Sequence, residues 1–270
     1  MGKKKIVWIT GGGSGIGQAL ASAYAARGFQ VVISGRREAK LQQVKKDIEA
    51  SGGACLAVVC DVCKDEEIQA SLKHIIECFG QLDIVIANAG FAVNGRIETL
   101  TSDHWHKQLN VNVIGAAQTV RFSLPYLQKT QGRIVLISSG MAYIRAAKSG
   151  AYAASKAALT AIGESLHQEL AGTGISCTVV HPGFVESEIG QVDNEGVFHA
   201  EEKDRRPEKL LWSKEKAAKV IVRAVEKRKR MFTFTAHAKV GVWIARYCPD
   251  LIYYAMTWGK SKKKRMISIY

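Results

Sequence analysis

Short apolar runs alternate with longer helical patterns along roughly the first two thirds of the chain. The expected strands are nearly continuous apolar runs, as is typical of strands covered on both faces. They lie at Ile6–Thr10, Gln30–Ser34, Ala54–Cys60, Ile84–Asn88, Arg133–Ser138 and Ser176–His181. Helical patterns fill the gaps at residues 15–28, 37–51, 64–79, 103–129 and 150–172. This alternation predicts an α/β fold of Rossmann type, a doubly wound parallel sheet in three layers, α/β/α.

The length of 270 residues suits a single domain of this kind. The composition changes late in the chain, where residues 186–216 are charged and poor in strand pattern. Such a segment is either a functional flap over the site or a solvated loop. We therefore expect a catalytic domain over residues 1–236, with a flap at about 186–216, and a C-terminal helical extension over residues 237–270.

The net charge of +14 favours an anionic partner, which could be nucleic acid, a phosphorylated ligand or a membrane surface. The basic residues are spread over Lys3–Lys5, Lys227–Arg230 and the C-terminus, without a nucleic-acid-binding motif, so we expect no nucleic-acid partner. The apolar run Ile6–Ile9 is too short for a signal peptide, and no stretch is long enough to span a bilayer. The expected location is cytoplasmic.

The six cysteines raise the question of a metal site. Cys60 and Cys63 form a C-x-x-C pair, with Cys55, His74 and Cys78 nearby, and such spacing occurs in zinc sites. No second C-x-x-C follows, and the pair straddles the end of an expected strand. We expect reduced, partly buried thiols and no metal.

A glycine-rich turn follows the first strand directly, with the sequence Thr10-Gly11-Gly12-Gly13-Ser14-Gly15-Ile16-Gly17. Glycines at such a turn let the backbone approach a pyrophosphate, whose charge then lies on the amides of a helix N-terminus. The spacing differs from G-x-G-x-x-G, and the Gly-Lys-Ser/Thr of a P-loop is absent. A tight β–α connection would also use glycines, but the place after the first strand favours a dinucleotide site.

The end of the second strand distinguishes the two nicotinamide cofactors. An NAD site uses a carboxylate there to accept from the ribose 2′-hydroxyl. This chain has no acidic residue until Glu38 and offers Arg36 and Arg37 instead. Guanidinium groups suit a 2′-phosphate, so the sequence favours NADP(H), with a pair of solvated arginines as the alternative.

Tyr152 and Lys156 lie four residues apart in an expected helix and so share one face. A tyrosine with a pKa of about 10 is a poor base at neutral pH. A neighbouring ammonium favours the phenolate, and we expect Lys156 to lower the pKa of Tyr152. The pair alone is common by chance and gains weight only from further motifs.

Those further motifs occur in the order of a known family. They are Asp61-Val62, Asn88-Ala89-Gly90, Asn112 within Asn110–Val113, Ser139 thirteen residues before Tyr152, and Pro182-Gly183 followed by Ser187. With the glycine turn, they make the chain resemble the short-chain dehydrogenase/reductase family over about residues 5–190. Ala87 stands where that family often has a second Asn.

The resemblance implies an oxidoreductase that transfers a hydride between NADP(H) and a carbonyl or secondary alcohol. Tyr152 would exchange a proton with the substrate oxygen, Ser139 would position that oxygen, Lys156 would hold the nicotinamide ribose, and Asn112 would hold a relay water. The cofactor-binding residues that it implies are Gly11, Ser14, Gly15, Ile16, Gly17, Arg36, Arg37, Asp61, Val62, Asn88, Ala89, Gly90, Tyr152, Lys156, Pro182, Gly183, Val185 and Ser187. The alternative is an NADP-binding sensor or scaffold without turnover, which the complete tetrad disfavours.

The sequence identifies the residues of the substrate pocket less clearly than those of the cofactor site. Apolar candidates for its lining, each of which could equally be core, are Met141, Ile144, Phe184, Val185 and Ile189. The resemblance also implies a homodimer or homotetramer through the helices near 103–129 and 150–172.

An amphipathic stripe near the C-terminus consists of Val240, Trp243, Ile244, Tyr247, Leu251, Tyr254, Ala255 and Trp258. Pro249 is expected to divide it into two helices. The basic cluster Lys260, Lys262, Lys263, Lys264 and Arg265 follows. An aromatic stripe beside such a cluster suits peripheral contact with an anionic membrane, and packing on the domain or across a dimer is the alternative. Membrane contact would suggest a steroid, retinoid or long-chain keto substrate.

Overall fold

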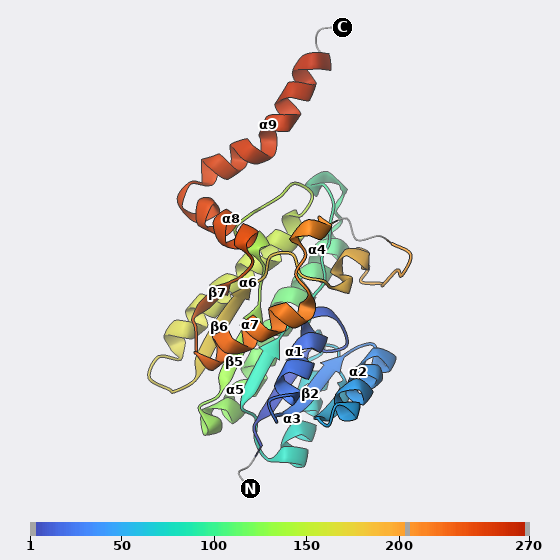
Figure 1. The fold of residues 1–270 in the computed structure, drawn as a ribbon, viewed down its shortest axis with the longest axis vertical. Coiled ribbons are helices and arrows are strands. Elements are labelled where there is room, and N and C mark those ends of the chain that lie inside the picture. The colour runs from blue at the N-terminus through green and yellow to red at the C-terminus, as the bar shows by residue number, and fades with distance from the viewer. Residues whose placement is uncertain (1–3, 203–205, 268–270) are drawn as a thin grey trace.

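Seven parallel strands form the central sheet of the computed structural model, which describes residues 4–202 and 206–267, the segment 259–267 by its backbone alone. The strands are β1 (Ile6–Thr10), β2 (Gln30–Gly35), β3 (Ala54–Val59), β4 (Ile84–Ala87), β5 (Arg133–Ile137), β6 (Ser176–His181) and β7 (Met231–Thr233). Their order is β3-β2-β1-β4-β5-β6-β7 (Figure 1). The order reverses between β1 and β4, and ligands bind at such switch points. The predicted doubly wound fold is confirmed.

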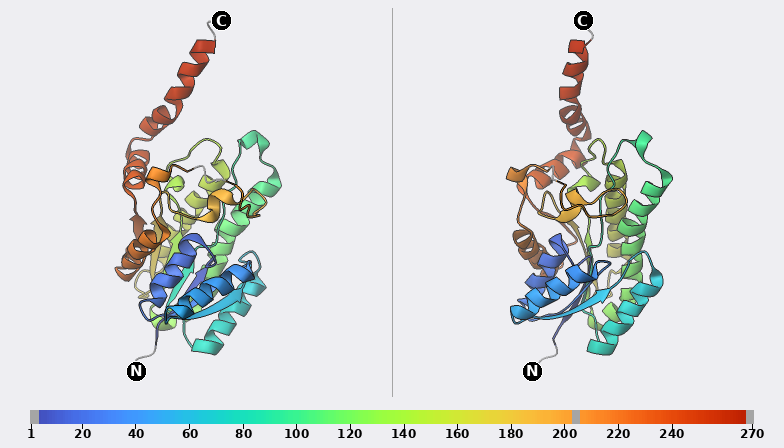
Figure 2. Two further views of the ribbon diagram at one scale, coloured as in Figure 1. Left: turned by 45° about the vertical axis from the view of Figure 1, so that its right-hand side comes forward. Right: turned by 90° about the vertical axis from the view of Figure 1, so that its right-hand side faces the viewer.

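Helices cover both faces of this sheet (Figure 2). One face packs against α1 (Gly15–Ala25), α2 (Glu38–Ala50) and α7 (Lys214–Glu226). The other packs against α3 (Asp65–Phe79), α5 (Ala116–Thr130) and α6 (Gly150–Glu169). Successive strand residues serve opposite faces, so Val7 and Ile9 join the first core and Trp8 the second. All three are fully buried, which explains the continuous apolar strands.

The helical segment expected over residues 103–129 is confirmed, with a π-helical turn inside it. The chain forms α4 (Ser102–Leu109), a π-helical turn (Asn110–Gly115) and then α5. The buried Asn112 side chain bonds Phe91 and Ser155 at this turn. Gly115 is also close to Val62, where an added Cβ would lie 2.7 Å from the Val62 Cγ2. These contacts hold the π-helical turn against the interior of the domain. π-helical turns often mark functional sites.

Two further helices end the chain, α8 (Ala236–Tyr247) and α9 (Pro249–Ile267), with the expected break at Pro249. One side of α8 covers the ends of β5 and β6: an added Cβ on Gly241 would lie 2.5 Å from Ile144 Cδ1, and one on Gly183 would lie 3.0 Å from Ala238 Cβ. Helix α9 extends away from the body (Figures 1 and 2). Among the described residues, no helix has the length and apolarity needed to cross a bilayer.

Candidate active site

A cavity of about 790 Å³ opens where β1, β2, β4, β5 and β6 end. It brings together most of the residues that the sequence proposes for cofactor and catalysis. Those that line it are Gly11, Ser14, Gly15, Ile16, Arg36, Arg37, Asp61, Val62, Asn88, Ala89, Gly90, Ser139, Tyr152, Lys156, Pro182, Gly183, Val185 and Ser187. Gly17 and Asn112 are not among the lining residues. Gly17 packs against Gly11, and Asn112 packs against Gly90, both of which line the cavity.

The glycine turn is shaped by close backbone contacts. Gly11 and Gly15 have φ of +64° and +53°, a region that side chains disfavour. A Cβ at Gly17 would lie 2.3 Å from the Gly11 carbonyl oxygen, so Gly17 serves packing within the turn rather than the cavity. The turn therefore leaves bare backbone facing the cavity at the N-terminus of α1, which fits the pyrophosphate of a dinucleotide.

Asn88 fixes this turn from the neighbouring strand. Its Nδ2 donates to the carbonyl oxygens of Thr10 at 2.9 Å and Gly11 at 3.1 Å. The Thr10 hydroxyl accepts in return from the backbone amides of Asn88 and Ala89, each at 3.1 Å. The Asn88 motif thus binds the ends of β1 and β4 together at the switch point.

Ser139, Tyr152 and Lys156 meet at the other end of the cavity. Ser139 follows β5, and its side chain is hydrogen-bonded with that of Tyr152 on the first turn of α6. Lys156 lies one turn later, with its Nζ 5.7 Å from the Tyr152 ring centroid. Its Nζ also donates to the Ile137 carbonyl oxygen at 2.8 Å, which fixes the position of the ammonium.

Burial dominates the electrostatics of these groups. It raises the pKa of Tyr152, against which the hydrogen bond with Ser139 and the positive charge of Arg206 act. Burial also lowers the pKa of Lys156 to about 8. Lys156 is not among the groups that shift the pKa of Tyr152 here, so the expectation that it lowers this pKa stays a prediction.

Asn112 lies behind Gly90 and is fully buried. Its Oδ1 accepts from the Phe91 amide at 3.1 Å, and its Nδ2 donates to the Phe91 carbonyl and to Ser155 Oγ, both at 3.0 Å. A Cβ on Gly90 would lie 3.0 Å from Asn112 Oδ1 and 3.5 Å from Lys156 Nζ. Glycine at this position leaves room for the Asn112 side chain, because a Cβ there would be in tight contact with Oδ1. The water predicted at Asn112 stays a prediction.

Both arginines at the end of β2 line the cavity and are exposed. Arg37 donates to Ser14 Oγ at 3.0 Å and forms an ion pair with Glu188 of the flap. Sequence reasoning missed Glu188, as well as Phe198 and Arg206, which also line the cavity from the flap. Arg206 donates to the carbonyl oxygens of Val185 at 2.8 Å and Ser187 at 3.0 Å.

The apolar candidates for the substrate pocket divide into two groups. Val185 and Ile189 line the cavity, whereas Met141, Ile144 and Phe184 are not among its lining residues. Phe184 stacks on His237 at a centroid distance of 5.2 Å, and Ile144 contacts α8 at Gly241. Helix α8 therefore covers two residues that the sequence alone could assign to a pocket.

The cysteine pair contributes one cavity residue. Cys60 is buried and lines the cavity, whereas Cys63 is exposed and donates its amide to Asp61 Oδ1 at 3.0 Å. Within residues 4–202 and 206–267, no group of three or more His, Cys, Asp or Glu side chains is arranged to hold a metal ion.

Comparison with known proteins agrees with this geometry. A model of the short chain dehydrogenase family matches residues 5–197. The 11-beta-hydroxysteroid dehydrogenase A of Sesamum indicum is 34% identical over 255 residues, which are 92% of this chain and 73% of that protein. A 3-ketoacyl-ACP reductase from Sinorhizobium meliloti superimposes with a TM-score of 0.74 at 31% identity, over 85% of this chain and 96% of the other.

A second solved structure supports the fold alone. It is a short chain dehydrogenase/reductase from Burkholderia phymatum in complex with NAD, with a TM-score of 0.83 and 24% identity over 93% of this chain and 96% of the other. The family model covers well over half of the chain, and it spans the glycine turn, Asn112, Ser139, Tyr152 and Lys156. The chain belongs to the short-chain dehydrogenase/reductase family and is an oxidoreductase of that family.

Proposed function

We propose that the protein uses NADP(H) to interconvert a carbonyl compound and a secondary alcohol. The observation that carries this proposal is the meeting of Ser139, Tyr152 and Lys156 in the cavity that also contains the glycine turn. Tyr152, Arg36 and Arg37 line the same cavity, which supports one bound molecule that contacts all three. The bare backbone at Gly11 and Gly15 suits a pyrophosphate between them.

The roles of the side chains follow from their positions. The Tyr152 hydroxyl donates its proton to the carbonyl oxygen, while Ser139 donates a hydrogen bond to the same oxygen and orients it. Lys156 holds the nicotinamide ribose hydroxyls and, with a water on Asn112, returns a proton to Tyr152. When bound, the nicotinamide supplies or accepts the hydride. The high pKa of Tyr152 keeps it protonated at neutral pH, which favours its role as proton donor.

Replacing Arg36 by aspartate tests the cofactor preference. The change removes a donor for the 2′-phosphate and adds a carboxylate that suits a ribose 2′-hydroxyl. We expect NADPH to bind about 10- to 100-fold more weakly and NADH to bind no worse, as for the loss of one charged hydrogen bond. Arg27→Asp is the control, because Arg27 lies at the far end of β2 and pairs with Glu226. Equal losses for NADPH and NADH in Arg36→Asp would contradict the assignment.

We also propose a hydrophobic substrate of the steroid, retinoid or long-chain keto type. The name of the Sesamum relative supports a steroid, and that of the Sinorhizobium reductase supports a keto-acyl compound. Phe91, Val185 and Ile189 provide apolar walls in the cavity. A catalytically silent NADP-binding sensor is the second candidate, and any consumption of NADPH with a panel of such ketones would reject it.

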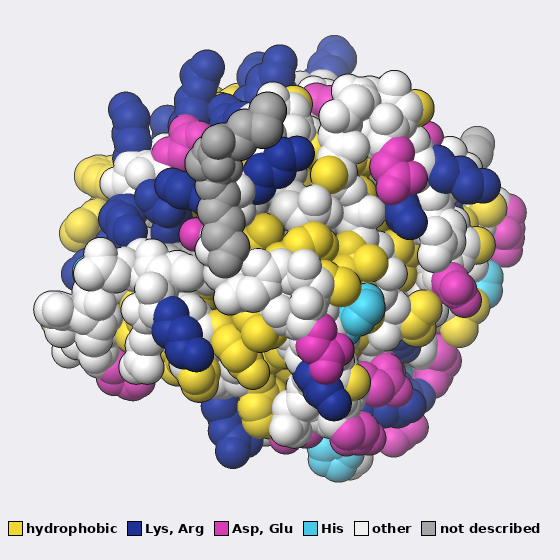
Figure 3. Space-filling view, turned by 90° about the horizontal axis from the view of Figure 1, so that it is seen from below, with side chains coloured by type: hydrophobic (Ala, Val, Ile, Leu, Met, Phe, Trp, Pro, Cys, Tyr) yellow, Lys and Arg dark blue, Asp and Glu magenta, His cyan; other side chains and the backbone are white. Residues whose placement is uncertain are grey.

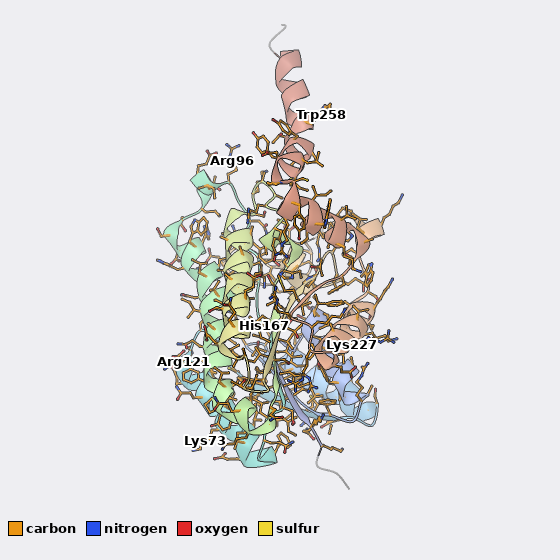
Figure 4. The ribbon with its side chains drawn as sticks, turned by 90° about the vertical axis from the view of Figure 1, so that its left-hand side faces the viewer. Lys73, Arg96, Arg121, His167, Lys227 and Trp258 are labelled. Atoms are coloured by element: carbon orange, nitrogen blue, oxygen red, sulfur yellow. The ribbon has the colours of Figure 1, made fainter. Side chains whose placement is uncertain are left out.

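The two C-terminal helices support peripheral contact between a cytoplasmic enzyme and an anionic membrane. Val240, Trp243, Tyr247, Tyr254 and Trp258 are each 59–67% exposed. Trp258 lies on the part of α9 that extends from the body (Figure 4). Residues 236–267 contain seven basic and one acidic residue, whereas the face seen from below carries basic and acidic side chains together (Figure 3). Aromatic rings beside excess positive charge suit an anionic bilayer surface.

Vesicle sedimentation tests this contact. We expect the protein to sediment with vesicles that contain phosphatidylserine and much less with phosphatidylcholine alone, since each basic residue contributes about 1 kcal/mol near an anionic surface. The triple variant Trp243→Ser, Tyr254→Ser, Trp258→Ser should stay in the supernatant. The control variant Ile97→Ser, Ile114→Ser, Val197→Ser alters exposed hydrophobic residues elsewhere. Equal sedimentation of both variants, or a change of oligomeric state in the first, would contradict membrane contact and favour a subunit interface.

A further inference from the structure

Glu188, at the start of a short 3₁₀ turn in the flap (Glu188–Gln191), faces the cations at the end of β2. Its carboxylate pairs with the Arg37 guanidinium through one oxygen and with Lys40 Nζ at 3.1 Å through the other. The Glu188 side chain is only 20% exposed, so these pairs are better shielded than ordinary surface pairs. Both oxygens of Glu188 are thus bound by cations that line the cavity beside Arg36, where the 2′-phosphate is expected.

The rest of the flap reinforces this contact. The Phe198 ring centroid lies 5.6 Å from Arg37 Cζ and 5.7 Å from Lys40 Nζ. A Cβ on Gly196 would lie 3.5 Å from the Arg36 guanidinium. Residues of the segment 188–198 therefore lie against Arg36, Arg37 and Lys40, and several of them line the cavity at this end.

The far end of the same segment is attached across the cavity. Asn94 and Asn194 exchange hydrogen bonds of 2.8 and 2.9 Å, each through a backbone group of Asn94 and the side-chain amide of Asn194. Glu195 pairs with Lys107 and His104 of α4. The flap thus has two carboxylates that form ion pairs with the rest of the domain, Glu188 and Glu195. Of these two, only Glu188 pairs with an arginine of the proposed cofactor site.

We propose that Glu188 is a specificity-determining residue that competes with the 2′-phosphate of NADP(H) for Arg37 and Lys40. This inference rests on the proposed function. A phosphate at these donors would lie beside the carboxylate, and two anions cannot share the donors without repulsion. NADP(H) must therefore displace Glu188, whereas a 2′-hydroxyl leaves the pairs in place. Glu188 accordingly weakens NADP(H) binding and has little effect on NAD(H).

The test compares fragments that differ only in the 2′-phosphate. In Glu188→Gln, titration calorimetry should show 2′,5′-ADP binding about tenfold tighter than in the wild type, with 5′-AMP unchanged, as for release of one charged competitor. The matched control is Glu195→Gln, which removes the other flap carboxylate and should leave both affinities unchanged. Glu188→Ala should behave as Glu188→Gln does, which excludes an effect of the new amide.

Two results would overturn the inference in distinguishable ways. Weaker or unchanged 2′,5′-ADP binding in both Glu188 variants would show that the carboxylate orients Arg37 rather than competes for it, and would leave the NADP(H) preference intact. A wild-type protein that binds 5′-AMP as tightly as 2′,5′-ADP would overturn the NADP(H) preference itself, and the role of Glu188 with it.

Discussion

Replacing Tyr152 by phenylalanine is expected to lower turnover by about 10²- to 10⁴-fold, the usual contribution of a positioned general acid. The change removes the hydroxyl that meets Ser139 in the cavity and leaves the ring in place. NADPH affinity should change by no more than about fivefold, since one neutral hydrogen bond is worth about 1 kcal/mol or less. Initial rates of NADPH consumption and fluorescence titration measure the two quantities.

Tyr143→Phe is the matched control for this experiment. Tyr143 packs against His181 with the rings tilted and a centroid distance of 5.3 Å, and the Arg246 guanidinium lies over its ring. Tyr143 is not among the residues that line the cavity. Removal of the Tyr143 hydroxyl should leave turnover within about threefold of the wild type, because Tyr143 lies outside the reacting groups. Near wild-type turnover in Tyr152→Phe would show that another group delivers the proton.

Replacing Lys156 by methionine should abolish turnover and stabilise the free protein. Burial lowers the pKa of Lys156 from its ordinary value of 10.5 to about 8, so the charged lysine costs stability at any pH below about 8. A shift of this size corresponds to roughly 3 kcal/mol. Methionine removes that cost but leaves the Ile137 carbonyl without its donor, which costs about 1 kcal/mol. We expect a net gain of about 2 kcal/mol in the free energy of unfolding at pH 7.

The pH dependence checks this explanation. Between pH 8 and 10.5 the unfolded chain binds more protons at Lys156 than the folded chain, so wild-type stability rises relative to the variant. The advantage of Lys156→Met should therefore shrink as the pH approaches 10. Lys129→Met, at the exposed end of α5, should show no such trend. Urea unfolding at pH 7 and at about pH 10 measures the difference in the free energy of unfolding between Lys156→Met and the wild type. If Lys156→Met were less stable than the wild type at pH 7, this explanation would be contradicted.

The strands were predictable because both faces of the sheet are buried. Each expected strand ends within one residue of the observed one, since a buried parallel strand needs continuous apolar residues and ends where polar residues or glycine begin. Strand β7 was missed because Met231–Thr233 is a three-residue edge strand that is only partly buried, which leaves little pattern. Helix α7 was also not assigned, although its buried Ala218, Ile221, Val222 and Val225 follow helical spacing.

The site was predictable where it depends on local motifs and not where it depends on contacts across the chain. The glycine turn and the Tyr152–Lys156 pair each lie within a few residues, so their spacing carries the information. Glu188 and Arg37 are separated by 151 positions, and nothing in the local sequence pairs them. The direction of the Tyr152 pKa shift depends on burial and on Arg206, which lies far from Tyr152 in the sequence, so the local pattern could not give it.

The most direct test of the central claim is to follow the transferred hydrogen. The wild-type protein is incubated with NADPH that carries deuterium at both C4 positions and with a carbonyl compound that it reduces, from the steroid, retinoid and long-chain series. We expect the product alcohol to gain deuterium at its carbinol carbon in mass spectra, in amounts equal to the NADPH consumed, and Tyr152→Phe to form almost none. Failure to form a deuterated alcohol from any of these carbonyl compounds would contradict hydride transfer at this site.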